Sequence, residues 1–237
     1  MPKLAFVAAL SACALAMVAC SPPPPDPLEA AAGKVIQLSV PDDPTISFSV
    51  TWRVGSQNDP PGKEGLAALT GELIAQGSTT TNSYQAILEK LYPIASTYSV
   101  RVDKELTTLT GRTHRDNLEA FFQLFTEAYL QPAFPAEDFD RLRSNQQNSI
   151  ENDLRYAQDE VLAKDALTAF VFEGTPYAHP IAGTVAGVSS LTTDDVKAFY
   201  AENYRGENAT LALGGGYDPA LVKRFAATLA QLPAGRP

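Results

Sequence analysis

The chain has 237 residues, of which 45% are hydrophobic and 19% charged, so it is long enough for one or two globular domains with a sizeable core. Its formal net charge is -9, and it contains no run of basic residues. Because phosphate binding requires clustered Lys and Arg side chains, this composition argues against nucleic acid as a partner.

Residues 1–19 have the pattern of a secretory signal, with an apolar run from Leu4 to Met17 and small residues after it. Residues 17–20, Met-Val-Ala-Cys, resemble a bacterial lipobox, whose Cys becomes the lipidated first residue of the mature chain. We therefore expect export to the periplasm and a lipid anchor at Cys20; the alternative is a soluble periplasmic protein. With Cys13 removed and Cys20 acylated, no disulfide is expected.

Residues 20–33 are rich in Pro and predict an extended tether, which leaves residues 34–237 as the globular domain. Two strands are predicted first, at 34–40 and 45–54, separated by the turn Pro41-Asp-Asp-Pro44. Apolar residues at spacings of three and four then predict a helix between Gly65 and Gly77 with one buried face.

The remaining elements follow from the same periodicities. The sequence predicts helices at 82–91, 118–130, 135–154, 159–172, 192–203 and 219–229, strands at 96–102, 106–113 and 208–213, and a loop at 173–190. This order predicts an α+β fold in which helices pack on a largely antiparallel sheet.

The segment from Gly65 to Gly77 resembles the zinc helix of the insulinase-type (M16, pitrilysin-like) metallopeptidases, which carry Gly-Leu-Ala-His-x-x-Glu-His. The frame matches, but the two zinc-binding His fall on Ala68 and Glu72, and the Glu that activates water falls on Gly71. No His precedes His114, so no shift of the alignment restores the site. We therefore expect no zinc cofactor and no catalytic residue in this chain.

The resemblance extends over nearly all of residues 34–237, through residues 50–63, 130–143 and 174–210. It implies a two-layer α/β roll of the mitochondrial-processing-peptidase kind. It also places the family's third zinc ligand at Glu151, for which the alternative is an ordinary solvated helix face. His114, beside Arg112 and Arg115, is interpreted as a surface residue at a strand end. His179 lies in a loop that the family uses structurally, and a single His without a partner acid or thiol makes no catalytic triad.

In active members of the family, the substrate peptide adds as a strand to a sheet edge beside the zinc helix. The matching strand here contains Tyr98, Ser99 and Val100. Because such binding uses main-chain hydrogen bonds, we expect this domain to bind peptides even without the catalytic residues. The alternative is that another domain covers this edge.

Family subunits usually contain two homologous domains, and this sequence stops about where the first would give way to a linker. It is therefore either a natural half that pairs with a second M16-type subunit or domain, or a truncated chain. The resulting hypothesis is a catalytically degenerate M16-like domain of the bacterial envelope that binds a partner subunit or a peptide. The alternatives are an active zinc metalloendopeptidase that acts with a partner chain, and a structural envelope lipoprotein.

Overall fold

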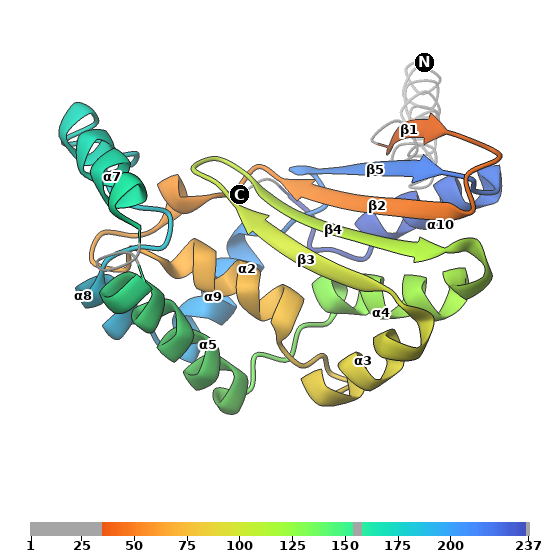
Figure 1. Ribbon diagram of the computed structural model, residues 1–237, viewed down its shortest axis with the longest axis horizontal. Coiled ribbons are helices and arrows are strands. Elements are labelled where there is room, and N and C mark those ends of the chain that lie inside the picture. The colour runs from red at the N-terminus through yellow and green to blue at the C-terminus, as the bar shows by residue number, and fades with distance from the viewer. Residues whose placement is uncertain (1–34, 154–157, 236–237) are drawn as a thin grey trace, which may run out of the picture.

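The computed structural model describes residues 35–153 and 158–235 (Figure 1). The expected signal (residues 1–19), the lipidation site Cys20 and the tether (residues 20–33) lie outside the described residues. Among the helices of the described ranges, none combines the length and the apolar character needed to cross a membrane.

A five-stranded sheet, with strand order β1-β5-β2-β4-β3, runs through the domain. The strands are β1 (Val35–Ser39), β2 (Thr45–Trp52), β3 (Thr97–Val102), β4 (Thr107–His114) and β5 (Ala209–Gly215). Of the strand pairs that the structure describes, only β1–β5 is parallel, so the prediction of a largely antiparallel sheet is confirmed. The first two strands are not neighbours, because β5 lies between them.

Helices cover one side of this sheet and leave the other side open (Figure 1). They are α2 (Leu66–Gln76), α3 (Tyr84–Leu91), α4 (Leu118–Leu130), α5 (Ala136–Asn148), α8 (Val185–Ser189), α9 (Thr193–Asn203) and α10 (Pro219–Leu229), with 3-10 turns at Ser56–Asn58, Tyr92–Ile94 and Arg115–Asn117. A π-helical segment, Ser149–Asp153, follows α5, and α7 (Asp159–Val171) stands out from the body. The predicted loop at 173–190 is wrong at α8, a single turn capped by the Thr184 hydroxyl, which accepts from the Gly187 N–H.

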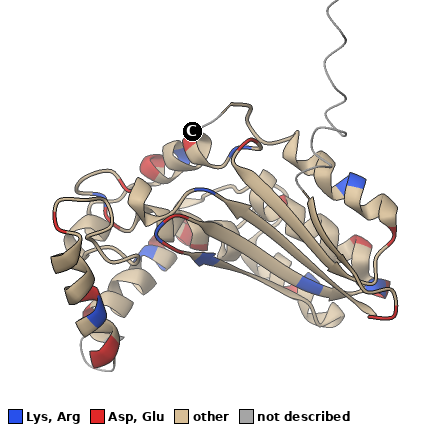
Figure 2. Ribbon diagram, turned by 90° about the horizontal axis from the view of Figure 1, so that it is seen from above, with Lys and Arg blue, Asp and Glu red and all other residues tan. Residues whose placement is uncertain are grey.

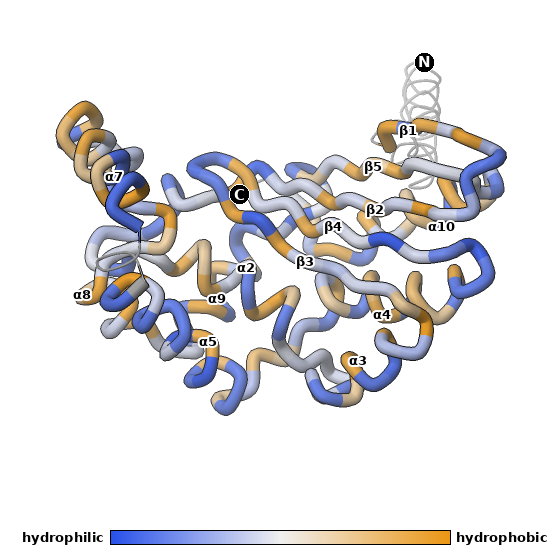
Figure 3. The backbone as a smooth tube through the Cα atoms, viewed as in Figure 1, coloured by the Kyte–Doolittle hydropathy of each residue, from blue (hydrophilic) through white to orange (hydrophobic). Residues whose placement is uncertain are grey.

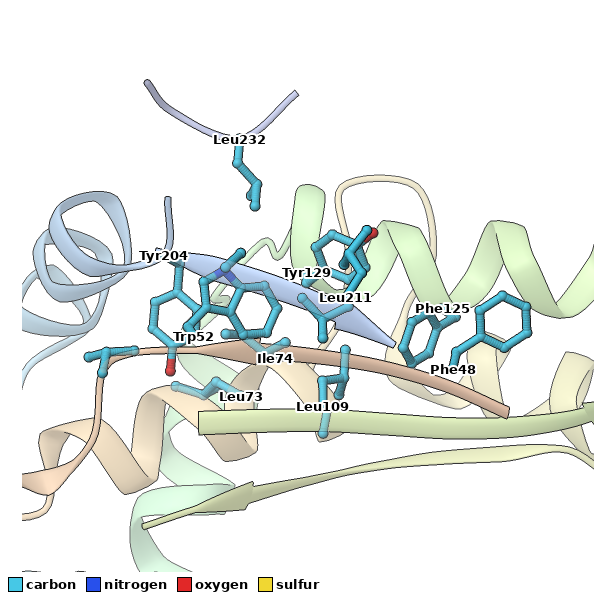
Figure 4. Packing of buried hydrophobic residues seen from close by; sticks show 14 of the residues in the cluster. Phe48, Trp52, Leu73, Ile74, Leu109, Phe125, Tyr129, Tyr204, Leu211 and Leu232 are labelled. Carbon is cyan, nitrogen blue, oxygen red and sulfur yellow. The ribbon is translucent and has the colours of Figure 1, made fainter. Parts of the chain in front are cut away.

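Aromatic residues of the central strand β2 hold the helices against the sheet (Figure 4). The Phe48 ring lies 5.7, 5.6 and 5.4 Å from the ring centroids of Phe121, Phe125 and Phe225. Trp52 contacts the rings of two Tyr residues in the same way. Polar residues of β2 alternate with these buried ones, as a period of two predicts. The buried side chains face the helices, and the polar side chains face the outer side of the sheet.

The N-terminus of α2 is anchored by a side chain from the preceding loop. Gly65, the N-cap residue, has a left-handed backbone (φ 105°) and offers no side chain. The Asp59 carboxylate takes that role, accepting the N–H groups of Gly65 and Ala67 at 2.7 Å each. From α5, the Gln146 amide donates to the carbonyls of Gly65 (3.0 Å) and Ala182 (2.7 Å), which ties the loop before α8 to the same point.

The Asp59 side chain is fully buried in this arrangement. Burial raises the pKa of its carboxyl to about 6, although the two backbone N–H groups act in the opposite direction. His179 lies next to it, with Nδ1 4.0 Å from the carboxylate, and Lys104 donates to the His179 carbonyl. The start of α2 thus depends on a carboxylate held in a site that disfavours its charge.

Asp59→Asn tests this anchor through pH. A carboxyl whose folded pKa lies above its unfolded value contributes stability that is full in acid and is lost as the pH rises through about 6. The free energy of unfolding of the wild type, relative to Asp59→Asn, should therefore fall by about 2 kcal/mol between pH 4 and pH 7.5, measured by urea denaturation. A difference between the two proteins that stays constant with pH would contradict the shift.

Candidate functional site

Three residues of α2 escape burial, and they form one stripe along the helix. Ala68, Glu72 and Gln76 are spaced four residues apart, so they lie above one another on one face. The other eight residues of the helix are buried. The Gln76 amide donates to the Glu72 carboxylate at 2.5 Å. The two positions that match zinc-binding His, Ala68 and Glu72, therefore do share a face, as the resemblance requires.

This stripe borders a cleft of about 370 Å³, here called the Glu72 cleft. Its walls come from α2, the end of β3, the π-helical segment after α5, α7 and the loop before α8. They include Ala68, Glu72, Val102, Ile150, Val161 and Asp165. The cleft is mostly apolar, with carboxylates contributed by Glu72 and Asp165.

Gly71, which matches the position of the catalytic Glu, is buried beneath β3. A Cβ atom on Gly71 would lie 2.6 Å from Cγ2 of Val102 and 3.4 Å from Cγ2 of Val100. Contacts under 3 Å force a neighbour to move, so any side chain at this position would displace the strand or the valine. The space above Gly71 is filled by the Val102 and Val100 side chains of β3.

Glu72 differs from an ordinary surface carboxylate. Burial raises its pKa above the usual value, and the hydrogen bond from Gln76 only partly offsets this. Within the described residues, no Lys, Arg or His forms an ion pair with Glu72. Its carboxylate is therefore desolvated without a positive partner.

The residues present do not fit zinc. Glu151, the position that matches the third ligand, is exposed on the π-helical segment, and it is the neighbouring Ile150 that lines the Glu72 cleft. His114 is a strand-end residue whose Nδ1 accepts from the Asp116 N–H, and His179 packs against Asp59. No group of three or more His, Cys, Asp or Glu among the described residues is arranged to hold a metal. Zinc needs three or four such ligands, so we derive no metal chemistry here.

The strand β3 forms the edge of the sheet beside α2. It pairs with β4 in a register that sets Val100 opposite Leu109, and the Asp103 N–H donates to the Leu106 carbonyl (2.7 Å) where the hairpin closes. Main-chain groups of alternate residues point to opposite sides of an antiparallel strand. Counting back from the hairpin, Tyr98, Val100 and Val102 direct their N–H and C=O groups away from β4, whereas Ser99 directs its own toward β4.

Two residues of this site carry no signal in the sequence. Val102 ends a predicted strand, and only its position above Gly71 connects it with the helix. Asp165 lies on α7, about a hundred residues after Glu72, and reaches the Glu72 cleft only through the path of the chain in space. Gln76, by contrast, follows Glu72 by four residues, and helical spacing alone relates the two.

Most of the chain is similar to a known protein family. Residues 34–185 match the model of the family described as Insulinase (Peptidase family M16). An uncharacterized zinc protease of Rickettsia bellii is 23% identical over 186 residues, which cover 78% of this chain and 44% of that protein. The mitochondrial-processing peptidase subunit beta of Dictyostelium discoideum is 20% identical over 161 residues, covering 68% of this chain and 34% of that protein.

Among solved structures, the peptidase M16 inactive domain from Pseudomonas fluorescens superimposes with a TM-score of 0.78 at 24% identity, covering 85% of this chain and 49% of that one. The chain thus spans less than half the length of these relatives. The family model covers well over half of the chain, and the α+β fold expected from the resemblance is confirmed. This chain belongs to the insulinase (M16) peptidase family.

Proposed function

We propose that this chain is a non-catalytic M16 domain that binds an extended peptide segment along β3. The observation that carries the proposal is the contrast between helix and strand. On α2, the ligand and base positions hold Ala68, Gly71 and Glu72, and β3 fills the space above Gly71. On β3, the edge that faces away from β4 keeps its main-chain donors and acceptors.

Strand addition requires no particular side chain on the receiving edge. Tyr98 and Val100 supply N–H and C=O groups on one side of β3, and each hydrogen bond to a peptide contributes about 1 kcal/mol. The structural relative from Pseudomonas fluorescens is itself called an inactive domain, which agrees with this interpretation. The alternatives of an active metalloendopeptidase and of a purely structural lipoprotein have no comparable support from the described residues.

The first test is metal content. After dialysis against micromolar zinc and then buffer, we expect the purified protein to retain almost no zinc, because Glu72 is the only ligand-type residue on the α2 stripe. Elemental analysis measures the zinc per chain. One tightly held ion per wild-type chain would overturn the proposal.

A matched variant shows that the assay can detect zinc in this cleft. Ala68→His together with Glu72→His puts two imidazoles four residues apart on the exposed stripe and leaves Gly71 unchanged. We expect this variant to take up more zinc than the wild type, with the Asp165 carboxylate of the same cleft as the third ligand, and to cleave no peptide, since Gly71 supplies no base. Failure to bind zinc would mean that the two positions do not converge.

The second test addresses the strand edge. Val100→Pro removes an N–H group that points away from β4, so it should leave the sheet paired while it weakens binding of a labelled ten-residue peptide about five-fold or more. Fluorescence anisotropy measures the affinity, and circular dichroism checks the fold.

Val100→Ala is the control, because it loses most of the side chain that packs near Gly71 but keeps the N–H group. We expect its affinity for the peptide to be much closer to that of the wild type than the affinity of Val100→Pro is. Equal affinity for peptide in Val100→Pro and in wild type would refute binding at this edge.

M16 proteins often work as paired domains or as subunits of larger assemblies, and we propose the same for this chain. The outer face of the sheet supports this: no described helix lies over it, and few charged residues lie across it (Figure 2). On β1, Ile36 and Leu38 are 64% and 68% exposed. The helix α7 is largely hydrophobic and unburied as well (Figure 3). A second M16-type domain or subunit would cover such surfaces.

The location of the protein rests on its first 33 residues. The signal pattern and the Cys at position 20 support export and lipid anchoring at a bacterial membrane. We therefore propose that the domain works in the envelope, held from the membrane by the Pro-rich tether.

A further inference from the structure

Two hollows lie on the helix side of β3, one at each end of the α2 stripe. The Glu72 cleft adjoins Val102, at the end of the strand. The second hollow, here called the α3 groove, has a volume of about 760 Å³ and adjoins Tyr98, near the beginning of the strand. A segment added along the edge of β3 would pass both hollows.

The α3 groove has an apolar lining. Its walls come from α3, the end of α2 and the start of β3, and they include Tyr84, Ile87, Leu88, Leu91, Tyr92 and Tyr98. Leu88 is 46% exposed and Tyr92 is 88% exposed. Large apolar side chains left open beside an unpaired strand edge favour a ligand that brings an apolar or aromatic side chain.

The Glu72 cleft has a different chemistry. Apolar side chains such as Val102 and Ile150 line it together with polar ones, which include a second carboxylate, Asp165. The Glu72 carboxylate has one hydrogen-bond partner, Gln76, and forms no ion pair within the described residues. A desolvated carboxylate without a counter-charge attracts a cation, and no group of three or more His, Cys, Asp or Glu in the described ranges surrounds Glu72 to hold a metal ion. An ammonium or guanidinium group on a flexible apolar stem fits both the walls and the charge.

The spacing of the two hollows matches the period of a strand. Tyr98 and Val102 are four residues apart on the same face of β3, about 13 Å along the strand. A peptide hydrogen-bonded beside β3 presents its own residues i and i+4 to that face. The peptide that satisfies both hollows therefore has an apolar and a basic side chain separated by three residues.

We propose that β3 selects an extended peptide with an aromatic or large aliphatic side chain for the α3 groove and, four residues away, a Lys or Arg side chain for Glu72. This inference rests on the proposed function, the binding of a peptide at the edge of β3. The β3 strand of a second copy does not supply the pattern, since Arg101 follows Tyr98 by three residues and so lies on the opposite face. Its net charge of -9 also favours a basic peptide over another copy.

The test uses short labelled peptides and the intact protein. The peptide Thr-Lys-Thr-Val-Thr-Phe-Thr and its reverse carry the two side chains four residues apart in either strand direction. A third peptide, Thr-Thr-Lys-Val-Thr-Phe-Thr, has the same composition with the two on opposite faces. We expect one of the first two to bind about ten-fold more tightly than the third, by fluorescence anisotropy.

Variants assign the preference to Glu72. Glu72→Gln keeps the shape of the side chain and removes its charge. It should weaken binding of the peptide with Lys about ten-fold, and it should leave unchanged the binding of an analogue with norleucine in place of Lys. Glu137→Gln, at an exposed site in the first turn of α5, removes the same charge elsewhere and should change neither. Leu88→Ser should weaken the binding of peptides that contain Phe. It should leave unchanged the binding of peptides that have Ser in place of this Phe.

The outcomes separate this inference from the proposed function. If Glu72→Gln affects the Lys and norleucine peptides equally, or if the third peptide binds as tightly as the first two, the selectivity is refuted. In that case, weaker binding of every peptide by Val100→Pro would still support peptide binding at β3. If no peptide binds the wild type at millimolar concentration, both the selectivity and the proposed function fail.

Discussion

The arrangement of this domain depends on how the start of α2 is held. An α-helix exposes unpaired N–H groups at its N-terminus, and here the N-cap residue is a glycine that cannot satisfy them. The Asp59 carboxylate accepts two of these groups, and the Gln146 amide binds the Gly65 carbonyl from the opposite side. These bonds join the loop before α2, the loop before α8 and helix α5 at one buried point. With that point fixed, the direction of α2 under β3 and the exposed stripe Ala68-Glu72-Gln76 follow.

The proposed loss of catalysis involves packing as well as ligands. Gly71 allows Val102 to approach α2 so closely that a Cβ atom would have no room. A Glu side chain at this position would displace β3 or the Val102 side chain, whereas imidazoles at positions 68 and 72 would face an open cleft. In this domain β3 therefore packs closely over Gly71, whereas Ala68 and Glu72 border an open cleft.

Binding by a strand edge tolerates such changes, because the chemistry resides in the main chain. The edge of β3 is fixed by its pairing with β4, and the helix side beneath it is shaped by α2 and α3. On the proposed function, side chains at the positions that match the family's zinc site serve recognition instead of hydrolysis. A carboxylate in the place of a zinc ligand is one such case, since its charge remains uncompensated among the described residues.

The sequence by itself determined the local elements, and its resemblance to the family predicted that the zinc ligands are missing. Periodicity located α2 and the five strands, and the prediction about the ligands rests on the absence of His before residue 114. It missed α8, a single turn whose Thr cap lies within a run rich in Gly and Pro. Only the tertiary structure decided that β5 lies between β1 and β2, that Val102 covers Gly71, and that Tyr98 and Val100 rather than Ser99 face the open edge. The physical reason is that hydrophobic periodicity reports which face of one element is buried, whereas sheet order and register arise from contacts between residues far apart in the chain.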